Sequence, residues 1–278
     1  MTTPCKVKLY TEDKNVADKC FLEIKNNTLL LEKKYNFYDK KSYLNRVVNN
    51  RKRNKVIVDN QTFELLKQIR NLSENTNGAF DITVGTLKEC YQHDSLSKVN
   101  ACLDEKRPYT GLNSWFLKDK KLHFKDSRTL IDFGGVIKEY AVDEASQIAK
   151  KYDIGAALIN YGGDIYGYGL KPDGNMFSIG IKNPNNPKEN IAIIPLQNQA
   201  LTTSANYERN IKIENKSFSH IIGKIDTIDI VSATIISDSV LKSGVYSTVF
   251  MIEKDIVIPN EMGVLLVDKD MKIHQNLL

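Results

Sequence analysis

The stretch IDFGGVIKEYAVDEA, residues 131–145, guides the interpretation of the whole chain, because two glycines separate an apolar segment from a helix. Residues 130–135 predict a buried strand that ends at Gly134 and Gly135. The helix after them carries apolar residues on one face: Val136, Tyr140, Ala145, Ile148, Ala149 and Tyr152. Such a junction lets a ligand approach the backbone closely and offers free N–H groups to a phosphate.

Two side chains add chemistry to this junction. Lys138, one turn into the helix, supplies a mobile cation, and Asp132, just before the glycines, can accept a hydrogen bond from a ribose hydroxyl or a base edge. The alternative interpretation is a tight strand–helix turn with a surface lysine. Because the stretch matches neither a P-loop nor a GxGxxG motif, both interpretations stay open on this feature alone.

Hydrophobic periodicity predicts the elements on either side of this stretch. They are a half-buried strand at residues 5–9, a helix at 14–33 with Val16, Cys20, Phe21, Ile24 and Leu31 inward, a helix from Asp59 or Asn60 to Asn75 with Leu65, Leu66, Ile69 and Leu72 inward, a hairpin at 117–124, strands within 156–196 and near 199–204, 211–222 and 228–236, a short helix at 238–250, and a last hairpin at 263–274. The remainder of residues 92–128 is polar and is predicted to be irregular. Irregular interleaving of helices and strands indicates the α+β class, in one compact domain over residues 1–278.

Composition narrows the classes of function. The chain has 278 residues, of which 41% are apolar and 26% charged, as in soluble globular proteins. The net charge of +5 is small, and the basic run at residues 51–55 is interpreted as a solvated loop, so no nucleic-acid partner is expected. The four cysteines form no CxxC pair and the four histidines no metal-binding pair, which argues against a zinc site. We expect free thiols, with a bond between Cys90 and Cys102 in an oxidising compartment as the alternative.

Three further motifs carry candidate residues. NYGGDIYGYG brings Asp164 to a second glycine pair, and a glycine-rich bend between strands is the structural alternative. His220 follows the alternating pattern of a strand, where a histidine is more often structural than catalytic. In SGVYSTVF, Gly244 and Thr248 share a helix face, and the hydroxyls of Ser247 and Thr248 are candidate contacts for a metal or its waters, although this motif alone is weak.

Taken together, seven segments resemble motifs of the ApbE family, the FAD:protein FMN transferases, in the same order along the chain. Met1-Thr2-Thr3 resembles the opening Met-Gly-Thr, residues 38–45 resemble YDxxSELxxLN, residues 78–85 resemble GAFDPTVGPL, residues 132–143 resemble DLGGIAKGYAVD, residues 160–164 resemble NxGGD, residues 203–209 resemble TSGDYER, and residues 220–222 resemble the start of HIIDP. The resemblance implies mixed or antiparallel sheets with flanking helices. It also implies an enzyme that splits FAD and attaches FMN to a Thr or Ser of an acceptor protein.

The resemblance implies roles for the matching residues. Met1 and Tyr38 would flank the isoalloxazine ring, and the remainder of FAD would be held by Ala79, Phe80, Asp81, Asp132, Lys138 and Ile222. A Mg²⁺ ion would lie by the pyrophosphate, bound by the carbonyl of Gly135 and by an Asp/Thr pair one helical turn apart, where this chain offers Ser247 and Thr248. Lys138 would offset charge on the pyrophosphate, and His220 would support transfer as a general base.

Three positions depart from the family pattern. Gly244 stands where the metal-binding Asp is expected, and six residues of helix turn Asp238 about 240° away, so only Asp226 or Asp229 is left to replace it from a neighbouring strand. Gly223-Lys224 replaces the Asp-Pro that follows HII. Glu139 replaces the small residue after Lys138 and adds a carboxylate near the expected pyrophosphate, which is unfavourable unless a cation screens it.

These departures leave alternatives to an active transferase. One is an FAD-binding homologue that has lost transfer activity, and another is an FAD pyrophosphatase that uses water as the acceptor. The resemblance implies FAD and an acceptor flavoprotein with an FMN-binding domain as partners. It also implies a periplasmic or membrane-attached location, although the first residues contain no export signal and no site for a lipid anchor.

Overall fold

The computed structural model describes residues 3–205, 210–213, 216–219, 229–253 and 256–277. It confirms the α+β class, and the chain divides into two compact units. The first contains the described residues of Met1–Glu32, Val136–Glu208 and Thr227–Leu278, and the second contains those of Lys33–Gly135 and Arg209–Asp226. That the units form one domain over residues 1–278 stays a prediction.

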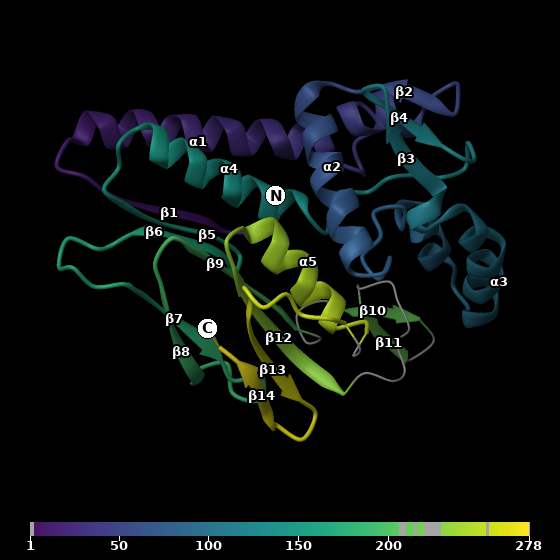
Figure 1. The fold of residues 1–278 in the computed structure, drawn as a ribbon. Helices are drawn as coiled ribbons and strands as arrows, with labels where there is room; N and C mark the ends of the chain where they lie inside the picture. The colour runs from purple at the N-terminus through teal and green to yellow at the C-terminus, as the bar shows by residue number, and fades with distance from the viewer. Residues whose placement is uncertain (1–2, 206–209, 214–215, 220–228, 254–255, 278) are drawn as a thin grey trace. The chain divides into compact units, whose positions relative to one another are not determined.

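The first unit is built on a seven-stranded antiparallel sheet in the order β1-β5-β6-β9-β12-β13-β14 (Figure 1). Its strands are β1 (Cys5–Tyr10), β5 (Ala156–Tyr161), β6 (Asp164–Gly169), β9 (Gln199–Ala205), β12 (Ile230–Ser237), β13 (Gly263–Asp268) and β14 (Ile273–Asn276). A hairpin of β7 (Phe177–Lys182) and β8 (Asn190–Leu196) packs apolar residues on one face of this sheet. The predicted strands within 156–196, near 199–204 and near 228–236 and the last hairpin are confirmed.

Helices α4 (Ile137–Lys151) and α5 (Val240–Phe250) cover the opposite face (Figure 1). The alternation of β9 shows this, because side chains of neighbouring strand residues point to opposite faces. Leu201 belongs to the cluster under the hairpin, whereas the hydroxyls of Thr202 and Ser204 bond to hydroxyls of α5. Strand β9 therefore presents a row of polar side chains to α5.

Helix α1 (Lys14–Tyr35) agrees with the predicted helix, and Cys20, Ile24 and Leu31 are buried as expected. The prediction that Phe21 lies inward is wrong, since its side chain is 49% exposed. The helix buries a narrow stripe, and Phe21 lies at its edge. In the part of the chain that the structure describes, no helix is long and apolar enough to cross a membrane.

The second unit contains α2 (Asn60–Asn75) and a three-stranded sheet in the order β2-β4-β3. Asp59 caps α2 by accepting the Thr62 N–H at 2.9 Å, and the four predicted inward leucine and isoleucine residues are buried. The remaining elements are β2 (Lys55–Ile57), β3 (Trp115–Lys118), β4 (Lys121–Phe124), β10 (Asn210–Ile213), β11 (Lys216–Ser219), α3 (Leu96–Lys106) and the short turns η1 (Leu44–Asn49), η2 (Gly85–Gln92), η3 (Arg107–Tyr109) and η4 (Leu112–Ser114). The hairpin at 117–124 is confirmed, and the described residues of 211–222 lie in two short strands instead of one.

Two predictions in this unit are wrong. Residues 96–106 form helix α3 rather than an irregular segment, because Ser95 caps it and Val99 and Leu103 bury one face. Of residues 130–135, Ile131, Asp132 and Phe133 are buried, but the segment forms no strand beyond a single bridge between Leu130 and Val84. The amide of Asn49 satisfies both backbone groups of Ile131 at 2.9 Å, which leaves no need for a neighbouring strand.

Cys90 and Cys102 form a disulfide that joins η2 to α3, so the expectation of free thiols is wrong for this pair. Cys5 and Cys20 are free. The two bonded cysteines are 12 residues apart, in a cluster with Leu87, Val99 and Leu103. The bond restricts the unfolded chain locally and holds α3 to the unit.

We expect the double variant Cys90→Ser/Cys102→Ser to lose about 2–3 kcal/mol of unfolding free energy, since a cross-link closing a short loop contributes about this much. Urea unfolding with and without reductant measures it. Reduction should destabilise the natural chain and leave the double variant unchanged. Cys5→Ser, at an exposed free thiol, is the matched control. Equal stability of the natural chain and the double variant would contradict the prediction.

Candidate functional site

Asp132 lies in the second unit, buried at 6% exposure, immediately before the glycine pair. Its carboxylate forms an ion pair with Lys88 and accepts the Gly134 N–H at 2.9 Å. The Lys88 ammonium also donates to the Tyr38 hydroxyl at 3.1 Å. Although burial acts the other way, Asp132 and Tyr38 raise the pKa of Lys88, which keeps it charged. The result is a fixed carboxylate beside an exposed aromatic ring, with Tyr38 77% exposed.

The segment at residues 79–81 is shaped by the turn that follows α2. The Ala79 N–H donates to the Thr76 carbonyl at 2.9 Å, and Phe80 is buried with its ring 3.7 Å from the point where a Cβ on Gly135 would lie. Asp81 accepts from the N–H and hydroxyl of Thr83 and from the Gly111 N–H at 2.9 Å. The side chain of Asp81 therefore holds two loops together, which leaves backbone as the part of this segment available to a ligand.

Lys138 lies in the first turn of α4, in the first unit, and its ammonium contacts two carboxyls. It forms an ion pair with Asp164, and Glu139 Oε1 lies 3.6 Å away. Asp164 opens β6 directly after Gly162 and Gly163, whose φ angles of 63° and 102° favour glycine. Lys138 and Asp164, which the sequence analysis took from two separate motifs, thus meet in one cluster of the first unit.

Both acids of this cluster are buried, with Glu139 7% and Asp164 2% exposed. Burial, followed by the nearby Asp164, raises the pKa of Glu139 to about 8. Burial also raises the pKa of Asp164, against the opposing effect of Lys138. Glu139 Oε2 accepts no hydrogen bond from any described residue. The cluster therefore holds two carboxyls and a lysine that balances one negative charge.

Glu139 points at Gly244 of α5. A Cβ built on Gly244 would lie 2.5 Å from Glu139 Cγ, far inside normal contact distance. One turn further along α5, Ser247 is fully buried, donates to the Gly244 carbonyl at 3.0 Å and shares a hydrogen bond with Ser204. Thr248 is half-buried. Glu139 thus occupies the space that a side chain at residue 244 would need.

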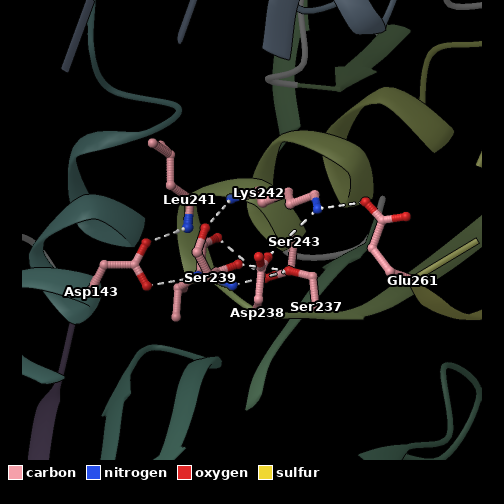
Figure 2. A network of polar contacts seen from close by, with 9 residues as sticks. Asp143, Ser237, Asp238, Ser239, Leu241, Lys242, Ser243 and Glu261 are labelled. Atoms are coloured by element: carbon pink, nitrogen blue, oxygen red, sulfur yellow. Dashed lines mark hydrogen bonds and ion pairs between the residues drawn. The ribbon is translucent and has the colours of Figure 1, made fainter. Parts of the chain in front are cut away.

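Asp143 fixes how α4 and α5 pack. Its carboxylate accepts the backbone N–H groups of Val240 and Leu241 at 2.7 and 2.9 Å, at the first turn of α5 (Figure 2). Ser239 caps the same turn by accepting the Lys242 N–H at 3.1 Å. Because Glu139 and Asp143 lie one turn apart on α4, as do Val240 and Gly244 on α5, these hydrogen bonds bring Glu139 opposite Gly244.

Asp143 also predicts a pH dependence. Burial raises its pKa to about 7, although the two N–H groups act in the opposite direction. The folded chain then holds this proton more tightly than the unfolded chain, so the contribution is present below about pH 4 and is lost as the pH rises through about 7. We expect the stability advantage of the natural chain over Asp143→Asn to fall by about 3–4 kcal/mol between these pH values, measured by urea unfolding. An advantage that grows with pH would contradict it.

The remaining residues that the sequence analysis named for the site are not part of these two clusters. Met1, His220 and Ile222 lie outside the described residues, as does Asp226. Asp229, which is half-buried, pairs with Lys269 at 2.9 Å, and Asp238, which is largely exposed, lies 3.6 Å from Lys242. The pairing of Asp238 with Lys242 agrees with the expectation that Asp238 does not replace the missing Asp. That Asp229 replaces it stays a prediction. Sequence reasoning missed Lys88, which carries no motif of its own and meets Asp132 only through the fold.

Each unit thus contains a lysine–carboxylate pair beside glycine turns, on a fold with a distinctive sheet order. The family profile described as "ApbE family" matches residues 1–258. The chain belongs to the ApbE family. Its α+β architecture is therefore shared with that family.

Comparison with known ApbE family proteins supports this at the level of sequence and fold. The FAD:protein FMN transferase of Vibrio cholerae is 25% identical over 264 residues, which cover 91% of this chain and 79% of that protein. That of Salmonella typhimurium is 25% identical over 195 residues, and the match spans 56% of its length. The crystal structure of the ApbE protein from Thermotoga maritima superposes with a TM-score of 0.87 at 26% identity, over 98% of this chain and 93% of that one.

Proposed function

We propose that this ApbE family chain is an FAD:protein FMN transferase, which moves FMN from FAD to a Thr or Ser of an acceptor flavoprotein and releases AMP. The observation that carries the proposal is the Lys138 cluster, where an ammonium lies at the first turn of α4 beside two buried carboxyls. A helix N-terminus with a lysine suits a pyrophosphate. The curated relatives, which carry this enzyme name, agree with that chemistry.

The reaction is a substitution at phosphorus. The acceptor hydroxyl oxygen bonds to the FMN phosphorus, the bond from that phosphorus to the bridging oxygen breaks, and AMP leaves with that oxygen. The hydroxyl proton passes to a base, and His220 has this role by resemblance alone. Lys138 offsets negative charge on the pyrophosphate, so positioning and electrostatics supply most of the acceleration.

The second unit supplies recognition of FAD. Lys88 and the Gly134 N–H hold Asp132 in one orientation, which suits it to accept from a hydroxyl or a base edge. The exposed ring of Tyr38 offers a stacking surface for the isoalloxazine, together with Met1 by resemblance. The backbone of Ala79, Phe80 and Asp81, together with Ile222 by resemblance, completes the binding set.

Mg²⁺ is the metal of this proposal, and when bound it would supply positive charge to the pyrophosphate. Gly135, Ser247 and Thr248 alone offer only neutral oxygens, whereas Mg²⁺ prefers one or two carboxylates together with substrate phosphates. Among the described residues no group of three or more His, Cys, Asp or Glu side chains is placed to hold a metal. Glu139 and Asp164 nevertheless supply two carboxyls beside α5, so the residues fit a site of the Mg²⁺ type.

A location in an oxidising compartment, periplasmic or attached to the membrane through an N-terminal lipid anchor, is part of the same proposal. The bond between Cys90 and Cys102 supports it, since disulfides persist in oxidising compartments and are rare in the cytosol.

Intact-mass spectrometry tests the proposed function. An acceptor FMN-binding domain is incubated with the chain, FAD and Mg²⁺, and the proposal expects a mass gain equal to one esterified FMN together with release of AMP. An acceptor whose Thr or Ser is replaced by Ala is the control. AMP release without any gain in acceptor mass would instead indicate hydrolysis of FAD. FAD binding without either product would indicate a homologue that has lost transfer.

A further inference from the structure

The carboxylate that α5 lacks is present on the facing helix. Gly244 leaves α5 without a side chain at this position, and Glu139 of α4 fills that space, with Cγ 2.5 Å from where a Cβ would lie. The register is fixed by Asp143, one turn along α4, which bonds to the N–H groups of Val240 and Leu241. The contact between Glu139 and Gly244 therefore follows from the hydrogen bonds of Asp143, which fix the register of α4 against α5.

Glu139 lies in a buried cluster that contains two carboxyls and one ammonium. Its carboxyl is buried, and Oε2 accepts no hydrogen bond from any described residue. Asp164, also buried, meets the same Lys138 ammonium. Lys138 supplies one positive charge for two buried carboxyls, so a second cation is needed for both to be present as carboxylates. A hard divalent cation accepts oxygen ligands of this type and would remove the imbalance.

Hydroxyl oxygens lie on the two elements next to these carboxyls, β9 and α5. Thr202, paired with Ser243 at 3.0 Å, and Ser204, paired with Ser247 at 2.9 Å, line the boundary between β9 and α5. Thr248 lies one helical turn from Gly244 and so presents its hydroxyl on the same side of α5. Hydroxyl oxygens complement carboxylates in sites for Mg²⁺ or Mn²⁺, which usually retain several waters.

We infer that Glu139 reaches from α4 into the space left by Gly244 and, with Asp164, supplies the carboxylate oxygens of a site for a hard divalent cation. The carboxylate that the resemblance implies on α5 would in this chain come from α4 and occupy the space beside Gly244. Lys138 then exchanges Asp164 for the phosphate of a bound substrate. The inference rests on the proposed function in that it concerns the same phosphate-handling site.

The test measures cation binding without FAD, acceptor or turnover. Mn²⁺ is titrated into the natural chain, Glu139→Gln and Glu144→Gln, and free Mn²⁺ is followed by electron paramagnetic resonance. The amide in Glu139→Gln keeps the shape of the side chain and removes its charge. We expect the natural chain and Glu144→Gln, altered on the same helix, to bind one Mn²⁺ that Mg²⁺ displaces. Glu139→Gln should bind at least about tenfold more weakly, as even outer-sphere changes at metal sites cost tenfold or more.

A double variant, Glu139→Gly/Gly244→Asp, returns the carboxylate to α5. It should bind Mn²⁺ within about tenfold of the natural chain, and its urea unfolding midpoint shows whether it is folded. Unchanged affinity in Glu139→Gln, or no Mn²⁺ bound by the natural chain, would overturn the inference. Binding that depends on Glu139 in a chain that never transfers FMN would overturn the proposed function alone.

Discussion

Replacing Gly244 with Asp, without any other change, is expected to lower the unfolding free energy by about 3–5 kcal/mol. The new Cβ would lie 2.5 Å from Glu139 Cγ, and α4 cannot move aside while Asp143 holds the start of α5. The variant would also place a third carboxylate beside Glu139 and Asp164 in a buried cluster. Overpacking costs about 1–3 kcal/mol and an unpaired buried charge costs more, so the two effects reach this range together.

Urea unfolding of three chains separates the two effects. Gly244→Ala introduces the same Cβ without a charge, and the gain in helix propensity of about 1 kcal/mol offsets part of its clash, so its loss should stay below about 2 kcal/mol. Adding Glu139→Gly to Gly244→Asp removes both the clash and the extra charge and should restore most of the stability. A stable Gly244→Asp single variant would show that Glu139 is free to turn away.

Replacing Lys138 with Met is expected to reduce the rate of FMN transfer at least about 100-fold, because one preorganised charged donor is worth about this much when it faces a developing negative charge. The same change removes the ammonium that contacts both Asp164 and Glu139. Removing one partner from a buried ion pair costs about 3–5 kcal/mol, and here protonation of the carboxyls absorbs part of this. We therefore expect a loss of about 2–3 kcal/mol of unfolding free energy.

The rate is measured by acceptor mass and the stability by urea unfolding. Lys151→Met, at an exposed position in the last turn of α4, is the control and should change the stability by less than about 1 kcal/mol and the rate hardly at all. Full stability with a large loss of rate in Lys138→Met would show that the ion pair contributes no net stability. An unchanged rate would contradict the role of Lys138.

Most of the fold could be predicted because its elements carry strong local signals. The helix at residues 60–75 has a capping Asp59 and a periodic apolar face, and the strands after residue 156 alternate between turns. Helix α3 could not be predicted, since only a few apolar residues anchor it and a disulfide holds it in place. The strand predicted at residues 130–135 does not form. An apolar pattern predicts burial but does not determine which group bonds to the backbone, and here the side chain of Asn49 bonds to Ile131 in place of a neighbouring strand.

Some residues of the candidate site could also be predicted from the sequence, and others could not. Asp132 and Lys138 could be found because they lie beside glycines at the end of an apolar run. The partners that fix them, Lys88 and Asp164, come from distant segments, and only the fold brings them together. Glu139 and Gly244 looked like two independent departures from a pattern, since nothing in the order of residues reveals that one fills the space of the other.

The contact between Glu139 and Gly244 also limits how parts of this chain can be exchanged with those of a relative. A chimera that receives α4 with a small residue at position 139, but keeps Gly244, has neither the carboxylate nor the packing between the helices. The opposite chimera, with an acidic α5 on the natural α4, has two side chains in one space. Helices α4 and α5 therefore have to be exchanged together, because a chimera that takes only one of them loses the fit between residues 139 and 244.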